Sequence, residues 1–124
     1  TMASVLFADD DADIRALASQ LLGRRGHHVI TVGDGSEAIM LLSEFIPDMV
    51  ITDLNMPQQD GYAVCCAVRE SPRLRNIPLV LITALPEDDV RVLQIVSESR
   101  AILLAKTDIV SLPDLADQLV SSAA

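Results

Sequence analysis

The sequence predicts a single α/β domain in which helices cover both faces of a parallel sheet. Apolar runs of strand length alternate five times with segments of helical spacing, and the connections between them are short. The run 78–83 is apolar almost throughout, which is typical of a strand buried on both faces. A length of 124 residues suits one domain. This alternation favours a doubly wound sheet of the (βα)5 type.

The five expected strands are short apolar runs that stop at a polar or turn-forming residue. Their length and their spacing by helical segments favour strands over helices. They cover residues 4–8, 29–32, 49–52, 78–83 and 101–105.

The first two helices are indicated by apolar side chains at helical spacing. Between residues 14 and 22 these side chains recur at i, i+3, i+4, i+7 and i+8, and Gly26 is expected to stop the helix. The second helix follows a Gly-Asp-Gly turn. We expect Ser36 as its N-cap and Pro47 as its end.

The last three helices carry recognisable start signals. We expect the third helix to open at Gly61 and to stop before Pro72. Pro86 is expected to start the fourth, whose first turn would be the acidic segment 87–89, where the helix dipole favours negative charge. Ser111, with an aspartate three residues later, resembles a capping box for the last helix.

The charge of the chain excludes several classes of partner. It has 18 acidic and 9 basic side chains, a net charge of −9, and its aromatic fraction is 2%. Without a basic stripe or stacking aromatics, direct nucleic-acid binding and binding to an anionic membrane surface are disfavoured. A cation, or a partner with a basic face, suits such a surface.

The two cysteines, Cys65 and Cys66, are adjacent within an apolar helical segment. They form neither a disulfide framework nor a metal-binding pair. We see no signal peptide and no apolar run of about 18–20 residues that could span a membrane. The expected location is the cytoplasm.

Chemically reactive side chains follow four of the five strands. The segment 9–11 is three aspartates after the first strand, Asp53 follows the third, Thr83 ends the fourth, and Lys106 follows the fifth. Each alone could be a helix cap, a turn residue or a solvated side chain. Ligands bind beyond the carboxyl ends of such strands, so their joint placement indicates one site. The pair His27-His28 falls at the opposite edge, where we expect a solvated turn.

Crowded carboxylates repel one another, and one takes up a proton unless a cation joins them. A hard divalent ion with oxygen ligands satisfies this demand, and Mg²⁺ is the natural candidate because it binds one or two carboxylates together with phosphate and water. No histidine or cysteine follows these strands, which disfavours zinc or copper.

These motifs resemble the receiver domain of two-component response regulators, of the chemotaxis-regulator type. The matching segments are VLFADDDADIR at 5–15, DMVITDLNMPQQDGYAV at 48–64, PLVLITAL at 78–85, and Lys106 after ILLA. They extend over essentially the whole chain, so the resemblance implies one receiver domain over 1–124. It also implies a flavodoxin-like sheet of strand order 2-1-3-4-5.

The resemblance implies a role for each residue near the metal. Asp53 would be the phosphoacceptor, attacking the phosphorus of a phosphohistidine on a sensor kinase. Mg²⁺ would be bound by Asp10 and Asp53, by the backbone carbonyl of Asn55, and by Asp9 through water. Asp11 falls outside this scheme, and we assign it to helix capping.

On the phosphoryl side, the resemblance implies that Thr83 hydrogen-bonds a phosphoryl oxygen and that Lys106 pairs with the same group. Phosphoryl transfer requires in-line placement and compensation of charge on the equatorial oxygens, which Mg²⁺ and lysine supply together. Self-catalysed phosphorylation and hydrolysis of Asp53 would be the only chemistry, so we do not expect an enzyme acting on a separate substrate.

Three departures from the family pattern lie in the last third of the chain. Thr107 stands where proline usually follows the lysine, and Leu103 where a switching aromatic is usual. The segment 97–100 also lacks the usual Gly-Ala before the fifth strand. We therefore expect intact phosphorylation chemistry and a modified readout through Leu103.

Two other functions stay open at this stage. One is a degenerate receiver, an interaction module that no longer switches. The other is a phosphatase of the haloacid dehalogenase class, although its D-x-D motif follows the first strand, whereas Asp53 follows the third and has Asn55 two residues later. The expected partners are a sensor histidine kinase or phosphotransfer protein and a downstream output protein or domain. The resemblance also allows a homodimer through the fourth helix, fifth strand and fifth helix.

Overall fold

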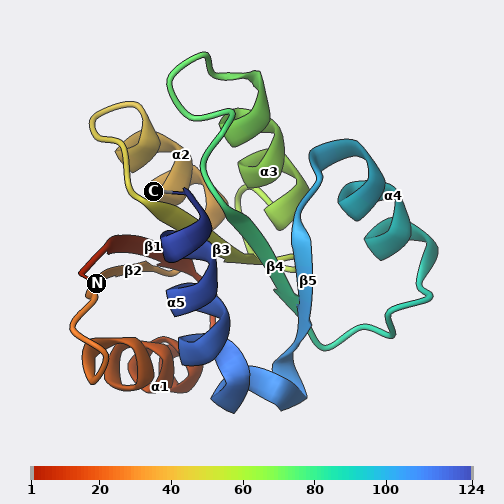
Figure 1. Ribbon diagram of the computed structural model, residues 1–124. Coiled ribbons are helices and arrows are strands. Elements are labelled where there is room, and N and C mark those ends of the chain that lie inside the picture. Colours follow the sequence, from red (N-terminus) through yellow and green to blue (C-terminus); the bar gives the residue numbers. More distant parts are fainter. Residues whose placement is uncertain (1, 124) are drawn as a thin grey trace.

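The computed structural model describes residues 2–123, so the first and last residues of the predicted domain 1–124 lie outside the described part. Five parallel strands form one sheet in the order β2-β1-β3-β4-β5, which confirms the predicted order (Figure 1). The strands are β1 (Ser4–Ala8), β2 (His28–Val32), β3 (Met49–Asp53), β4 (Leu79–Thr83) and β5 (Ile102–Ala105).

Helices cover both faces of this sheet, as the sequence predicts. Helices α1 and α5 pack on one face, and α2, α3 and α4 on the other (Figure 1). A 3₁₀ helix, Lys106–Ser111, joins β5 to α5. The α-helices are α1 (Ala12–Gly23), α2 (Gly35–Leu42), α3 (Gly61–Glu70), α4 (Val90–Ser99) and α5 (Leu112–Ala123). Within the described residues, no helix combines the length and apolar character needed to cross a membrane.

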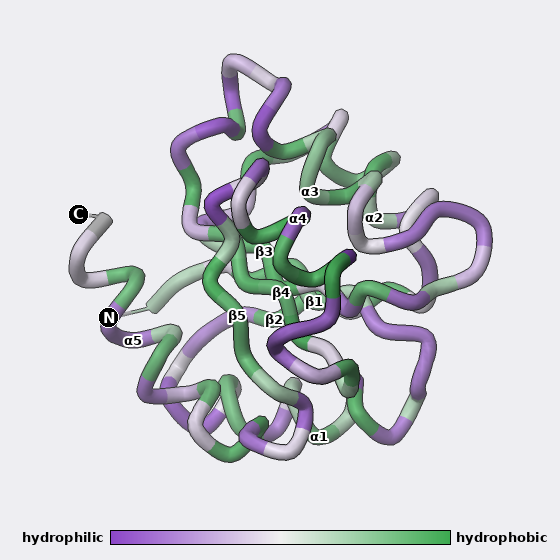
Figure 2. Tube along the Cα trace, turned by 90° about the vertical axis from the view of Figure 1, so that its right-hand side faces the viewer, coloured by the Kyte–Doolittle hydropathy of each residue, from purple (hydrophilic) through white to green (hydrophobic). Residues whose placement is uncertain are grey.

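The core is divided in two by the sheet. Alternate strand residues such as Val5 and Phe7 face α1 and α5, whereas Leu6 and Ala8 face the other three helices. Strands β3 and β4 are buried at every position. Figure 2 shows the result: apolar strands at the centre and polar connections at the periphery. The carboxyl ends of the strands are thereby fixed on an aliphatic base.

Two predicted helix starts are wrong in detail. Asp34, not Ser36, caps α2 by accepting a hydrogen bond from the Glu37 N–H, and α2 ends at Leu42, well before Pro47. Asp34 outcompetes Ser36 because its carboxylate is also stabilised by the helix dipole.

The fourth helix also starts differently from the prediction, whereas the fifth starts at the predicted place. Residues 86–89 form a turn, closed by the Asp89 N–H donating to the Pro86 carbonyl, and Asp89 caps α4. At α5 the Leu112 N–H donates to the Ile109 carbonyl of the preceding 3₁₀ helix. Helix α5 therefore begins directly after Ser111, as predicted, but the chain enters it already hydrogen-bonded through the 3₁₀ helix.

The turn between α4 and β5 contains a strained residue. Arg100 caps α4 in the left-handed conformation, with φ 58° and ψ 29°. This is the position at which the sequence lacks the usual glycine. A non-glycine side chain in this conformation costs about 1–2 kcal/mol of folding free energy. A glycine would avoid that cost but would lose more conformational entropy on folding, worth roughly 0.5–1 kcal/mol.

We predict that Arg100→Gly stabilises the fold by about 0.5–1 kcal/mol, the difference between these two costs. Urea denaturation should show a higher midpoint with an unchanged m-value. The matched control is Arg24→Gly, because Arg24 caps α1 at φ −64° and gains nothing from glycine. Equal destabilisation by both substitutions would contradict the assignment of strain to Arg100.

The predicted solvated turn at His27-His28 is wrong for His27. His27 is 5% exposed, and its Nε2 lies 2.6 Å from Asp117 Oδ1 on α5. Arg25 pairs with Asp117 and Asp114 at 2.6 and 2.8 Å. The hydrogen bond from His27 and then that from Arg25 lower the pKa of Asp117. The α1–β2 turn is therefore tied to α5, and its histidine is a packing residue.

We predict that Asp117→Asn lowers stability at neutral pH and that this loss disappears in acid. A carboxyl group with a lowered folded-state pKa stabilises above its unfolded pKa of about 3.9 and loses that contribution as pH falls through the folded value. Thermal unfolding of the two proteins between pH 7 and pH 2 checks this. Glu44→Gln, at an exposed residue, is the control and should track the wild type throughout.

Candidate functional site

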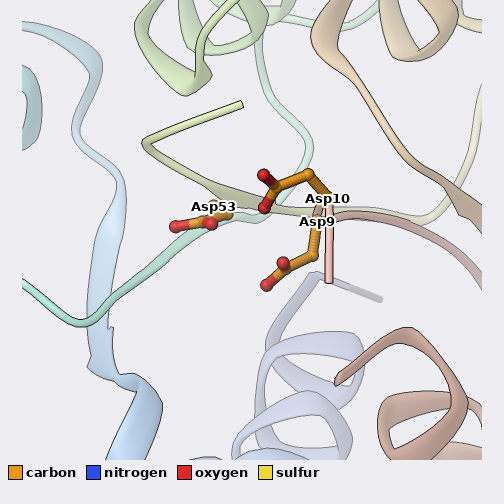
Figure 3. A group of neighbouring side chains, drawn as sticks. All are labelled: Asp9, Asp10 and Asp53. Atoms are coloured by element: carbon orange, nitrogen blue, oxygen red, sulfur yellow. The ribbon is translucent and has the colours of Figure 1, made fainter. Parts of the chain in front are cut away.

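Three carboxylates meet at the carboxyl edge of the sheet. Asp9 and Asp10 follow β1, and Asp53 is the last residue of the adjacent strand β3. One oxygen from each of the three lies within 4.8 Å of the others. Asp9 and Asp53 are buried, whereas Asp10 is exposed at the rim (Figure 3). The strand pairing thus brings together the acidic residues that the sequence singled out.

Lys106 supplies the cation within this cluster. Its Nζ lies 3.0 Å from Asp53 Oδ2 and 3.0 Å from Asp9 Oδ2. Only the contact with Asp53 has hydrogen-bond geometry, so Asp9 Oδ2 is a buried carboxylate oxygen without a hydrogen-bond partner among residues 2–123. The peptide bond after Lys106 is trans. The single lysine of the chain therefore bridges two buried carboxylates.

Burial and ion pairing have opposite effects on the pKa values of the charged groups in this cluster. Burial raises the pKa of Asp53, the hydrogen bond from Lys106 opposes this rise, and the negative charge of Asp9 adds to it. Burial by itself would lower the pKa of Lys106, but the hydrogen bond to Asp53 and the ion pair with Asp9 raise it overall. The ammonium therefore stays charged, and the site holds more negative charge than one lysine neutralises.

Thr83 ends β4 and is 1% exposed. Its Oγ1 accepts a hydrogen bond of 3.1 Å from the Leu85 N–H, which leaves the hydroxyl proton free to be donated. Thr83 is in register with Ala105, the residue before Lys106. A single hollow of about 360 Å³ at this edge is lined by Thr83, Leu103 and Lys106.

Asn55 and Leu103 occupy less enclosed positions. Asn55 is exposed in the β3–α3 loop, and its Oδ1 accepts a 3.4 Å hydrogen bond from Arg91 of α4. With Asp10 it lines a second hollow of about 410 Å³. Leu103 is half-buried in the edge strand β5. Within residues 2–123, neither Asn55 nor Leu103 makes a side-chain hydrogen bond to the carboxylate cluster, so their predicted roles stay predictions.

Sequence reasoning missed Arg15. Its Nη1 donates a 2.8 Å hydrogen bond to the backbone carbonyl of Asp9. A Cβ at Gly33 would lie 3.3 Å from that nitrogen, so the missing side chain there leaves room for the guanidinium. Asp11 caps α1 as predicted, and its N–H donates to Asp9 Oδ1 at 2.9 Å. The only sequence signal for Arg15 is its helical spacing from the aspartates.

Two glycines hold the β3–α3 loop that follows Asp53. The Gly61 N–H donates to the Leu54 carbonyl at 2.7 Å, and a Cβ at Gly61 would meet the Asp53 carbonyl oxygen. The Gly35 N–H donates to the Gln59 carbonyl at 3.1 Å, where a Cβ would also clash. The loop can approach α2 and α3 this closely only because both positions lack a side chain.

The donor set fits a hard divalent cation. The converging donor atoms are all carboxylate oxygens, from Asp9, Asp10 and Asp53, and such oxygen ligands favour Mg²⁺ or Ca²⁺ over zinc or copper. The buried oxygen Asp9 Oδ2 lies 3.0 Å from Lys106 Nζ without hydrogen-bond geometry, so its lone pairs are available to a bound cation or its water.

Comparison with known proteins identifies the family. The response regulator receiver domain family matches residues 5–112. The chain belongs to this family. A probable transcriptional regulator, ycf27 of Guillardia theta, is 40% identical over 85 residues, which are 68% of this chain and 32% of that protein. The response regulator PleD of Caulobacter vibrioides is 38% identical over 84 residues, 67% of this chain and 18% of that protein.

Solved receiver structures share the fold across the chain. The receiver domain of a histidine kinase from Syntrophus aciditrophicus has a TM-score of 0.87 at 31% identity, covering 97% of this chain and 91% of that one. The chemotaxis protein CheY4 of Vibrio cholerae has a TM-score of 0.84 at 28% identity, covering 96% and 99%. This receiver spans about a third or less of the curated relatives above.

We predict that Gly61→Ala destabilises the receiver by about 1–3 kcal/mol, because the added Cβ would force the Asp53 carbonyl and the loop apart. The amide resonances of Asp53 and Leu54 should shift. The control is Gly23→Ala, since nothing lies within 4 Å of a Cβ there. If Gly61→Ala proves as harmless as Gly23→Ala, the close packing of this loop does not position Asp53.

Proposed function

We propose that this receiver accepts a phosphoryl group on Asp53 from a phosphohistidine and thereby switches its contacts with other proteins. One observation carries the proposal: Asp9, Asp10 and Asp53 converge at the same sheet edge, with Lys106 bridging two of them. The family membership supports the same reaction class.

The metal in this proposal is Mg²⁺, held by Asp10 and Asp53, by the backbone carbonyl of Asn55, and by Asp9 through water. Bound there, the cation supplies charge compensation for the transferring phosphoryl group. The uncompensated negative charge of the cluster supports this assignment, since one lysine faces three carboxylates.

In the proposed transfer, an Asp53 carboxylate oxygen attacks phosphorus. The phosphorus–nitrogen bond to the donor histidine breaks, and its electron pair stays on the imidazole nitrogen. The Leu54 N–H, 2.8 Å from Asp53 Oδ1, fixes the orientation of the carboxylate. The result is an acyl phosphate in place of the Asp53 carboxylate.

Lys106 and Thr83 would then change partners. Lys106 loses its charged partner at Asp53 Oδ2 when that carboxylate becomes an acyl phosphate, and its ammonium can pair with a phosphoryl oxygen as a point charge. The Thr83 hydroxyl accepts one hydrogen bond and still has its own proton to donate to the phosphoryl group. Thr83 is the last residue of β4 and Lys106 directly follows the adjacent strand β5, so their movement reports the reaction to the β4–α4 and β5–α5 segments.

The proposed partners follow from this chemistry. The phosphoryl donor is a sensor histidine kinase or a phosphotransfer protein. The signal then passes to an output protein or output domain. Hydrolysis of the acyl phosphate by water resets the switch, so the chain turns over no separate substrate. The two free thiols support a cytoplasmic setting.

A second candidate is a receiver that binds its partner without switching. The observation that favours it is Leu103, half-buried beside the hollow of about 360 Å³, where the family usually has an aromatic side chain. Leucine has no aromatic ring that could move between a buried and an exposed position. The two candidates differ in one expected result: phosphorylation changes the structure of a switching receiver and leaves that of a non-switching receiver unchanged.

We predict that incubation with acetyl phosphate and Mg²⁺ adds one phosphoryl group, seen as one discrete increment in intact-protein mass. Asp53→Asn removes the nucleophilic carboxylate with little change in shape and should show no increment. Asp60→Asn, at the exposed N-cap of α3, is the control and should be modified like the wild type. An unmodified wild type would shift the assignment to the non-switching receiver.

We predict that Lys106→Ala retains Mg²⁺ binding but uncouples phosphorylation from structural change. The carboxylates that bind the metal remain, whereas the ammonium that follows the phosphoryl group is lost. Amide NMR spectra before and after phosphorylation check this, and the variant should lose most of the shift changes at β5 and α5. Shift changes equal to those of the wild type would refute the coupling role.

A further inference from the structure

A groove of about 390 Å³ lies at the amino edge of the sheet, opposite the carboxylate cluster. It is bordered by the α3–β4 loop, the α4–β5 turn and the last turns of α5, the first two of which lie toward the top of Figure 1. Its apolar lining consists of Ile77, Pro78, Leu79, Ile102 and Leu119, and its cationic lining of Arg69 and Arg100.

Arg69 is held rigidly in this groove. Its Nε donates to the Ser99 carbonyl at 2.6 Å, and its Nη1 donates to the carbonyls of Arg75 and Ile77 at 2.9 and 2.8 Å. These bonds fix the guanidinium plane while Nη2 makes no hydrogen bond within residues 2–123. A rigid guanidinium with free N–H groups is preorganised to bind an oxyanion.

Neither arginine has a carboxylate within ion-pair distance in the part of the chain that the structure describes, although acidic residues outnumber basic ones two to one. Burial and then the positive charge of Arg100 lower the pKa of Arg69. Two mutually repelling cations beside an apolar surface make an unbalanced charge that an anion would neutralise.

The backbone conformation of Arg100 is a second observation that supports a ligand site in this groove. It keeps a large side chain at φ 58°, where glycine would fold at lower cost. A strained residue persists where the structure over-determines it, and such residues cluster at ligand sites. The strain presents the Arg100 side chain on the same groove as Arg69.

We propose that this groove binds an amphiphilic oxyanion, whose carboxylate or phosphate head pairs with Arg69 and Arg100 and whose aliphatic body packs on the apolar lining. The site is separate from Asp53 by the full length of the strands, so it stands whether or not Asp53 is phosphorylated. Its charge is opposite to that of the carboxylate cluster, so the two edges of the sheet select ligands of opposite sign.

The test is an NMR titration of the metal-free protein with hexyl phosphate and with hexanoate, alongside inorganic phosphate and acetate. At least one amphiphile should shift the amides of Arg69, Asn76, Ile102 and Leu119 in a saturable manner. It should bind more than about tenfold tighter than its bare head group, because several CH₂ groups leave water. The amphiphile that binds tighter identifies the head group as phosphate or carboxylate.

Arg100→Gly is the decisive variant, because it removes the guanidinium and is expected to fold more stably. It should weaken binding about tenfold, as expected for a lost charged hydrogen bond. Arg24→Ala, outside the groove, should bind like the wild type. Unchanged affinity in Arg100→Gly, equal binding of amphiphile and bare anion, or shifts confined to Asp53 and Lys106 would each overturn the proposal.

Discussion

The ammonium of Lys106 between two buried carboxylates is the interaction on which the carboxyl edge depends. Asp9 is fully buried and Asp53 is 4% exposed, and like charges so placed cannot both stay ionised without a cation. Lys106, which follows the edge strand β5, reaches both at 3.0 Å. The residual negative charge is the basis for our proposal that this edge binds a divalent cation.

The rest of the fold serves to hold these charges in place. The parallel pairing of β1 with β3 sets the spacing of Asp9 and Asp53, and the continuous burial of β3 and β4 makes the base rigid. Close backbone approaches at Gly35 and Gly61 lock the loop after Asp53. Non-glycine residues with positive φ lie at both edges: Gln58 (φ 69°) in the loop after Asp53, and Arg100 at the opposite edge, where the chain departs from the family pattern.

The helix count and the acidic site followed from the sequence, because buried parallel strands and strand-end carboxylates leave clear local patterns. The strand order followed from the resemblance to a known family. What failed depends on contacts between distant segments. His27 is buried by Asp117, 90 residues away, and no local pattern shows this. Arg15 and Arg69 act on backbone carbonyls, which the sequence does not reveal. Asp34 and Asp89 replaced the expected helix starts because several capping residues compete within a few positions.

The most direct test of the account is a Mg²⁺ titration of the unphosphorylated protein, followed by amide NMR. We expect one saturable site, with shifts at Asp9, Asp10 and the segment 53–55. Asp10→Asn, which keeps the side-chain shape but removes a charge at the rim, should weaken binding by tenfold or more, roughly the worth of a charged ligand. The absence of saturable shifts at these residues, or unchanged affinity in Asp10→Asn, would contradict it.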